Sequence, residues 1–149
     1  MKKSLVPSML MISLLYAVGT MAGYGEIWSA RIKRMLAEQG FTGTVDSKCV
    51  HLSRIGTMKC GPELMDVVFY EWDETAAESP GLARHASYRV LFLHDSKFLG
   101  AYVVEDKPLL HNNVLIFPYP PHMGNQLKCA ADGPPAQAWL DGYNIPFSK

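Results

Sequence analysis

Residues 88–104, YRVLFLHDSKFLGAYVV, decide the fold class of this 149-residue chain. Two runs rich in β-branched and aromatic residues flank Asp95-Ser96, a polar pair suited to a tight turn. Apolar runs on both sides of such a turn are typical of a β-hairpin. We therefore predict two adjacent antiparallel strands in this stretch.

Further segments on both sides of this hairpin have the composition of strands. They are residues 44–52, 64–72, 114–117 and 126–130. An acidic loop at 73–83 precedes the hairpin. No segment long enough to form a helix separates the later strands, and parallel strands would need such a crossover. The sequence therefore favours an antiparallel meander.

The end of the chain contains the sharpest turn signal. Asp141-Gly142 lies between AQAWL (136–140) and YNIPF (143–147), and Asp-Gly supplies the positive φ angles of a type I′ turn. A two-residue turn places three apolar pairs on one face: Leu140 with Tyr143, Ala138 with Ile145, and Ala136 with Phe147. A slip of one residue would disrupt this face. Pro146 cannot donate to a ladder and predicts an edge strand, while a short helix over 134–141 is the alternative.

The clearest helical pattern covers residues 26–39 and ends at Gly40, a typical helix stop. Its apolar residues recur on one face at helical spacing: Trp28, Ile32, Met35 and Leu36. We expect this face to pack on the sheet. The predicted fold class is therefore α+β, an N-terminal helix packed on an antiparallel β-meander of roughly six to nine strands that could curl toward a barrel.

The first 22 residues have the features of a secretory signal peptide. Lys2 and Lys3 precede an apolar run, and residues 20–22, TMA, place small residues before a cleavage point after Ala22. Residues 23–149 would then form a single α+β domain. The alternative is an uncleaved membrane anchor, because residues 4–25 are uncharged and about long enough to cross a bilayer.

Export would allow disulfides among Cys49, Cys60 and Cys129. Turn-prone Ser53 and Gly56 lie between the first two cysteines, and a hairpin there would bring them face to face. We therefore predict a Cys49–Cys60 bridge. Cys129 could then pair with another chain, stay buried as a thiol, or replace either partner in the bridge. No C-x-x-C or H-x-x-x-H spacing is present, so we expect no metal site.

Composition and motifs exclude several function classes. Lys+Arg and Asp+Glu both number 14, whereas a dedicated nucleic-acid binder would show a basic excess. The sequence contains no G-x-S-x-G elbow, Walker loop or G-x-G-x-x-G cradle. We therefore expect neither a serine hydrolase of that type nor a nucleotide cofactor.

Acidic residues and histidines offer weaker catalytic patterns. Glu71, Asp73 and Glu74 could supply a glycosidase-like carboxylate pair, but adjacent acids at a strand end are more typical of a solvated loop. His94-Asp95 falls in the predicted turn, where Asp suits the turn geometry itself. A catalytic role would also require a nucleophile within reach. The sequence therefore names no catalytic residue.

The most distinctive surface candidate is FPYPPHM at residues 117–123. Its prolines favour a stiff, extended loop from which Tyr119 and His122 could project beside Pro120 and Pro121. Aromatic groups on stiff loops lose little entropy on binding, so these four residues are the candidate binding site. A short, stiff connector between strands is the alternative, and the acidic loop 73–83 could offer a second contact.

These observations together favour a small, exported, periplasmic or secreted binding protein without enzymatic activity, such as an inhibitor, an immunity protein or an envelope-accessory protein. Its expected partner is another protein; we expect no nucleic acid, and a membrane only through an uncleaved N-terminal segment. Two alternatives remain open. One is a small hydrolase-type enzyme using His94, His111 or His122 with Asp or Glu in a sheet cleft, and the other is a carrier of an apolar ligand inside a barrel.

Overall fold

The computed structural model describes residues 10–74 and 85–149. Nine strands, one α-helix and one 3₁₀ helix are present in this part of the chain. In chain order they are α1 (Leu10–Glu38), β1 (Val50–Cys60), β2 (Glu63–Glu74), β3 (His85–His94), β4 (Lys97–Val104), β5 (Leu109–His111), β6 (Val114–Ile116), η1 (Pro121–Met123), β7 (Gln126–Leu127), β8 (Gln137–Leu140) and β9 (Tyr143–Pro146). Residues 75–83 of the predicted acidic loop lie outside the part of the chain that the structure describes.

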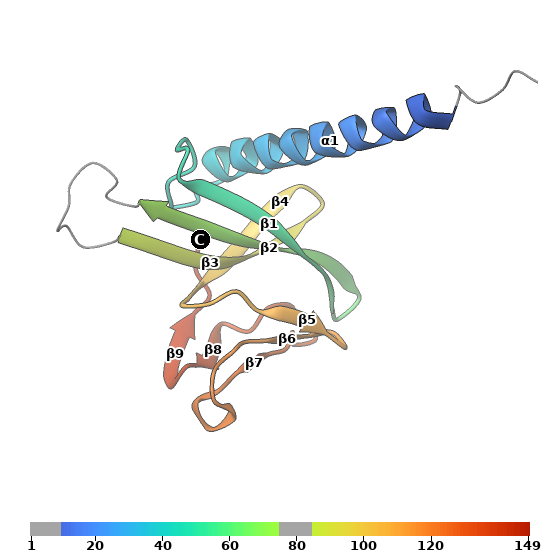
Figure 1. The fold of residues 1–149 in the computed structure, drawn as a ribbon. Coiled ribbons are helices and arrows are strands. Elements are labelled where there is room, and N and C mark those ends of the chain that lie inside the picture. Colours follow the sequence, from blue (N-terminus) through green and yellow to red (C-terminus); the bar gives the residue numbers. More distant parts are fainter. Residues whose placement is uncertain (1–9, 75–84) are drawn as a thin grey trace, which may run out of the picture.

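The four longest strands form one antiparallel sheet in the order β1-β2-β3-β4 (Figure 1). The predicted hairpin over residues 88–104 is confirmed as β3 and β4, whose turn pairs His94 with Lys97. Asp95 and Ser96 have φ angles of 47° and 63°, as a tight two-residue turn between twisted strands requires. The four strands are neighbours in the order of the chain, which is the connectivity of a meander.

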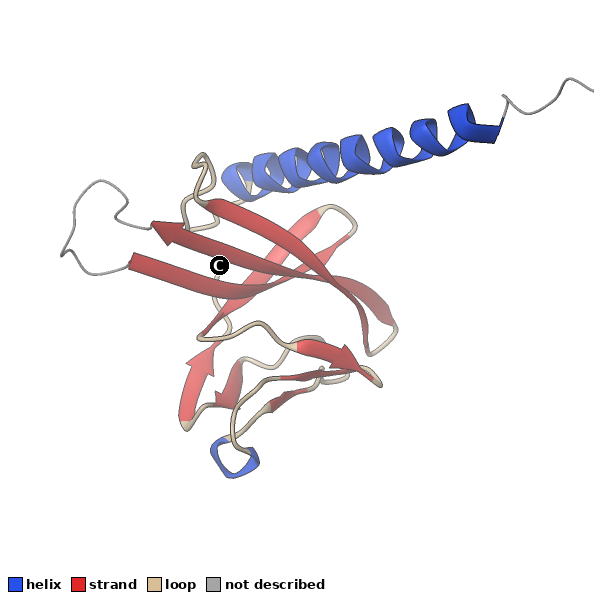
Figure 2. Cartoon of the chain, in the orientation of Figure 1, coloured by secondary structure: helices blue, strands red, loops and turns tan. Residues whose placement is uncertain are grey.

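The sheet has one covering layer on each face. α1 lies on one face, and the small sheets β5-β6-β7 and β8-β9 lie on the other (Figures 1 and 2). Val67, Val68, Phe69 and Tyr70 on β2 are consecutive buried residues, because alternate side chains enter different layers. This arrangement is α+β, but it consists of separate sheets that do not close, so the predicted barrel-like curl is not found.

α1 confirms the predicted helix and extends it toward the N-terminus. Met35 and Leu36 are buried against the sheet, and Trp28 and Ile32 pack beside them. Gly40 adopts a φ of 82° just after the last turn, which agrees with its predicted role as the stop. The helix begins at Leu10, earlier than the predicted 26. None of the helices that the structure describes is both long and apolar enough to span a bilayer.

The predicted strand over residues 44–52 is wrong in its bounds. The chain from 42 to 49 is a loop, and β1 runs without a turn from Val50 to Cys60. The turn-prone residues produce a local register shift between Arg54 and Gly56. A Cβ at Gly56 would lie 2.7 Å from Leu110 Cδ2, so glycine here permits β1 and β5 to approach closely.

This continuous strand explains why the predicted Cys49–Cys60 bridge is wrong. Cys49 precedes β1 and Cys60 ends it, so an extended strand separates the two by about 36 Å. A disulfide requires Cα atoms within about 7 Å. Cys60 instead pairs with Cys129 at a Cα–Cα distance of 5.0 Å, and Cys49 is a free thiol. The bridge ties β1 to the segment after β7.

The small sheets attach to the edges of the large one through specific polar contacts. Asn113, in the β5–β6 turn, accepts from the Lys59 N–H at 2.6 Å and donates to its carbonyl at 2.8 Å. Ser148, after β9, exchanges two backbone hydrogen bonds with Ala101 on β4, at 2.7 and 3.1 Å. Each contact satisfies backbone groups at an otherwise open strand edge.

The predicted C-terminal hairpin is confirmed with its register. Ala138 pairs with Ile145, and Leu140 pairs with Tyr143. The Phe147 N–H also donates to the Ala136 carbonyl at 2.9 Å. The alternative helix over 134–141 is therefore wrong, since the Asp-Gly turn and the apolar face both favour the hairpin.

Candidate functional site

Two segments that are separate in sequence meet at the end of the molecule opposite α1 (Figure 2). We call residues 118–124 and 139–143 together the tip. The Asp141 N–H donates to the Gly124 carbonyl at 3.0 Å, and the Gly142 N–H donates to the Met123 carbonyl at 2.5 Å. The β8–β9 turn and the proline-rich loop are therefore one hydrogen-bonded unit.

The loop of the tip is shaped by its own sequence. Pro120, with φ −58° and ψ 135°, leads into η1, which begins at Pro121 because proline suits the first helical position. The Met123 N–H donates to the Pro120 carbonyl at 2.9 Å, and the Gly124 N–H donates to the Pro121 carbonyl at 3.2 Å. These two bonds and the fixed φ of proline make the loop stiff.

Tyr119 does not project from this loop as predicted. Its side chain is buried, and its ring stacks on Phe117 with centroids 5.4 Å apart. Its hydroxyl accepts hydrogen bonds from the backbone N–H groups of Glu105 and Asp106, at 3.0 and 3.1 Å. Burial raises the pKa of Tyr119, while these two donors oppose the shift. Tyr119 therefore anchors the loop to the segment after β4.

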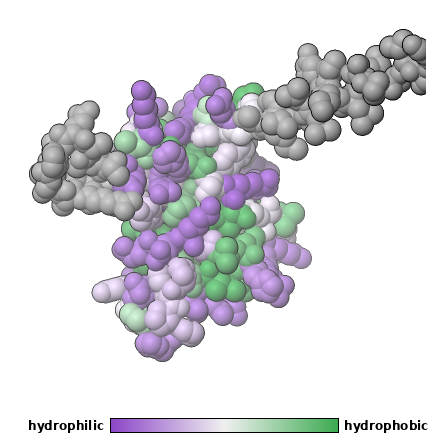
Figure 3. All heavy atoms as spheres, viewed as in Figure 1, coloured by the Kyte–Doolittle hydropathy of each residue, from purple (hydrophilic) through white to green (hydrophobic). Residues whose placement is uncertain are grey.

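The outer surface of the tip carries several exposed, rigid side chains. Pro120, Pro121 and His122 are exposed, as the sequence predicted for the candidate binding loop. Trp139 is 52% exposed and Tyr143 is 69% exposed, and both lie on the adjoining hairpin. In Figure 3 the lower end of the visible face mixes pale and purple spheres and shows little of the green of strongly hydrophobic residues.

Sequence reasoning missed the contribution of these two aromatic residues to the site. Alternation along β8 placed Trp139 on the outer face, and its neighbours Ala138 and Leu140 are buried as that pattern requires. Tyr143 belonged to the predicted apolar face, but its place beside the turn leaves it in solvent. Only the backbone contacts between the two segments show that they form one surface.

Trp139 is also held by close packing inside the tip. A Cβ at Gly124 would contact the Trp139 carbonyl oxygen and would lie 2.5 Å from the Trp139 ring atom Cδ1. Gly124 has a φ of 80°, a conformation that residues with a Cβ rarely adopt. Glycine is therefore required at position 124 for two reasons: the backbone has a positive φ, and the β8–β9 hairpin approaches too closely for a Cβ.

The histidines lie in different surroundings. His94 Nδ1 lies 2.9 Å from the Leu64 carbonyl, and His94 Nε2 lies 2.9 Å from Glu63 and 3.3 Å from Asp95. The Leu64 carbonyl raises the pKa of His94, and the two carboxylates add to this effect. His111 Nε2 instead lies 3.0 Å from the amide nitrogen of Asn112, and no hydrogen bond or ion pair joins any two histidines within the described residues.

The acidic residues lie at a strand end, as the sequence predicted. Glu71, Asp73 and Glu74 belong to the last residues of β2, which ends at Glu74. Within the described residues, no group of three or more His, Cys, Asp or Glu side chains could hold a metal ion. The tip is the best-defined candidate site among the residues that the sequence singled out.

Comparison with other proteins adds no assignment. No protein-family model, curated protein or solved structure matches this chain. The function is therefore argued from the geometry and chemistry of the chain.

Proposed function

We propose that this protein is a non-enzymatic binding protein that contacts another protein through the tip. The observation that carries the proposal is the convergence of the proline-rich loop and the β8–β9 turn, which presents Trp139 and Tyr143 beside Pro120, Pro121 and His122. A stiff surface of this composition has the features of a recognition site rather than of a simple connector.

The exposed aromatics suit protein recognition energetically. Tryptophan and tyrosine are enriched among the residues that dominate binding energy in protein interfaces. Both side chains extend from a hairpin whose backbone is fixed by the Gly142 to Met123 and Asp141 to Gly124 hydrogen bonds. Little conformational entropy would therefore be lost when a partner covers them.

The charge of the tip favours a protein over a nucleic acid. Residues 118–124 and 139–143 contain no Lys or Arg, and Asp141 is their one acidic residue. Affinity for nucleic acids depends mainly on basic side chains that neutralise phosphates. Aromatic and proline contacts instead match an uncharged, partly apolar protein surface.

The disulfide is compatible with an extracellular or periplasmic location. The partner is therefore expected in the cell envelope or outside the cell.

Affinity capture from an envelope extract tests the proposal. We expect the full chain to retain a defined partner that is lost when Tyr143 and Trp139 are both replaced by serine. Leu64→Ser is the matched control, because Leu64 is 63% exposed but lies beside the β1–β2 turn, outside the tip. Equal retention by the tip variant and the control would contradict the proposal.

A further inference from the structure

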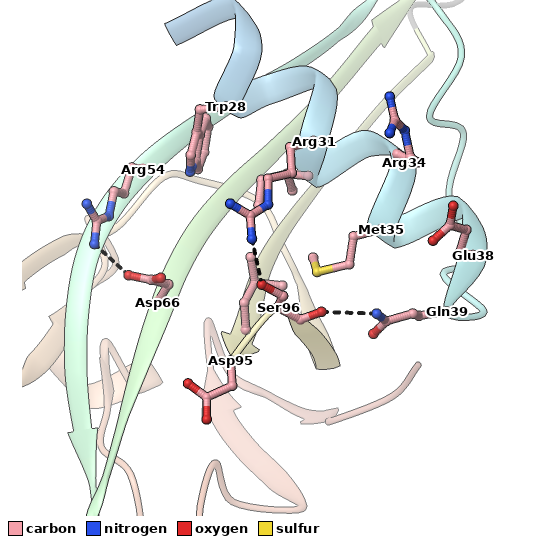
Figure 4. Close-up of a pocket in the computed structure, with 12 residues that line it drawn as sticks. Trp28, Arg31, Arg34, Met35, Glu38, Gln39, Arg54, Asp66, Asp95 and Ser96 are labelled. Atoms are coloured by element: carbon pink, nitrogen blue, oxygen red, sulfur yellow. Dashed lines mark hydrogen bonds and ion pairs between the residues drawn. The ribbon is translucent and has the colours of Figure 1, made fainter. Parts of the chain in front are cut away.

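A groove separate from the tip lies between α1 and the β3–β4 turn (Figure 4). Its volume is about 470 Å³, within the range of small-molecule sites. Nothing in the sequence patterns pointed to it, because its two walls are more than fifty residues apart in the chain.

The floor of the groove is apolar. Met35 and Leu93 are buried in the core beneath it, with 8% and 4% of their surface exposed. Trp28 and Ile32 are partly buried and pack against the same cluster. An apolar ligand group placed on this floor would remove additional hydrocarbon surface from water.

The two walls are fixed to each other by three hydrogen bonds. Arg31 Nη2 donates to Ser96 Oγ at 2.9 Å, and Gln39 Nε2 donates to the Ser96 carbonyl at 3.1 Å. The Phe98 N–H donates to Gln39 Oε1 at 2.7 Å. The turn and the helix therefore hold a preformed groove, which lowers the entropy lost when a ligand binds.

The two aspartates that line the groove each have a basic neighbour. Arg54 pairs with Asp66 at 2.6 Å. Asp95 lies 3.3 Å from His94 Nε2 and turns its carboxylate away from α1 (Figure 4). Arg34 and Glu38 also line the groove, and both are exposed to solvent, which screens their charges.

Arg31 has a different kind of neighbour. Within the described residues its only polar partner is the neutral hydroxyl of Ser96, so its charge has no carboxylate beside it. A guanidinium has five N–H donors in a planar fork, and this contact uses one nitrogen. Figure 4 shows Arg31 directed toward Ser96 across the groove, whereas Arg34 extends away from it.

We propose that this groove binds a small monocarboxylate with an apolar body. The carboxylate would accept two hydrogen bonds from Arg31, in the geometry that guanidinium groups favour. The apolar body would lie on Trp28, Met35 and Leu93. A single negative charge matches the single guanidinium of Arg31, which is directed toward Ser96 across the groove.

Titration of the full chain with 3-phenylpropionate, followed by amide NMR shifts, tests this proposal. We expect saturable shifts at Leu93, Ser96 and the Trp28 indole N–H. The uncharged isostere 3-phenylpropionamide cannot form the charged pair with Arg31. Its dissociation constant should therefore be at least about tenfold higher than that of the acid. Equal affinity for acid and amide would overturn the proposal, as would shifts that do not saturate.

Variants of two basic residues on α1 locate the carboxylate contact. Arg31→Gln should weaken binding of the acid about tenfold or more, and Arg31→Lys should restore part of the affinity because it keeps the charge. Lys33→Gln also removes one positive charge from the same helix, but Lys33 does not line the groove, so this variant should bind as the natural chain does. Equal weakening by Lys33→Gln would refute the assignment to Arg31. The tip variants described above should leave binding unchanged, so this result is independent of the proposed protein partner.

Discussion

Gly124→Ala tests whether the tip is a packed unit. The added methyl group would contact the Trp139 carbonyl oxygen and ring, and alanine would be forced into a φ near 80°. Gly40→Ala is a matched control, because Gly40 has a φ of 82° but no atom within 4 Å of the added Cβ. Both variants force alanine into a positive φ, and only Gly124→Ala also adds the close contact.

The expected loss of stability has two parts, the cost of the positive φ and the cost of the added contact. A left-handed conformation costs an L-residue roughly 1–2 kcal/mol, so Gly40→Ala should lower the free energy of unfolding by about that amount. Forcing an extra methyl group into a packed contact adds about 1–3 kcal/mol. Gly124→Ala should therefore lower the free energy of unfolding by roughly 2–5 kcal/mol. The effect of Gly→Ala on the unfolded chain is common to both variants and cancels in their difference.

Urea unfolding followed by circular dichroism measures both values, and hydrogen exchange at residues 139–143 locates the effect. We expect the excess destabilisation of Gly124→Ala to be accompanied by faster exchange in the β8–β9 hairpin. If Gly124→Ala and Gly40→Ala lower stability equally, the close approach of loop and hairpin is not part of the native fold.

Two further predictions concern covalent and ionic contacts. Cys129→Ser should lower the free energy of unfolding, measured in urea, by about 4 kcal/mol. The reason is that the bridge between Cys60 and Cys129 closes a loop between residues 69 apart in sequence. Cys49→Ser should change the free energy of unfolding little, because Cys49 is a free thiol. His94 has a folded-state pKa raised above 6.5, so the stability it contributes should be fully present below its unfolded pKa and be lost as pH rises through the folded value. NMR titration of the His94 ring, and unfolding of the natural chain and His94→Gln across this pH range, measure both effects.

Opposite results would correct these assignments. Strong destabilisation by Cys49→Ser, with little change from Cys129→Ser, would place the bridge elsewhere. A His94 ring that titrates below the usual histidine pKa would show that the Leu64 carbonyl and the carboxylates do not stabilise its charged form.

Local patterns predicted much of the fold. The hairpin over 88–104 and the one around Asp141-Gly142 depend on turn residues and alternation within a short stretch, and both were confirmed with their turns. The C-terminal part of α1 and its stop at Gly40 follow from helical spacing in the same way. Short-range sequence signals determine these elements, so tertiary contacts did not alter them.

The errors arose where a distant segment decided the outcome. Ser53 and Gly56 resemble turn residues, but pairing with β2 keeps β1 extended and separates Cys49 from Cys60. The sequence around Tyr119 is typical of an exposed aromatic residue on a proline-rich loop. In the structure its side chain is buried, and its hydroxyl accepts hydrogen bonds from the N–H groups of Glu105 and Asp106. Such partners lie outside the local pattern and could not be identified from it.

We propose that the tip is the surface through which this protein contacts a partner protein. Photo-crosslinking tests this in intact cells, with a photo-reactive amino acid in place of Tyr143 in the full chain. We expect a crosslinked adduct of defined mass from position 143, which is lost on Trp139→Ser, and no such adduct from the same probe at Leu64. The absence of any adduct from position 143, or an identical adduct from position 64, would contradict it.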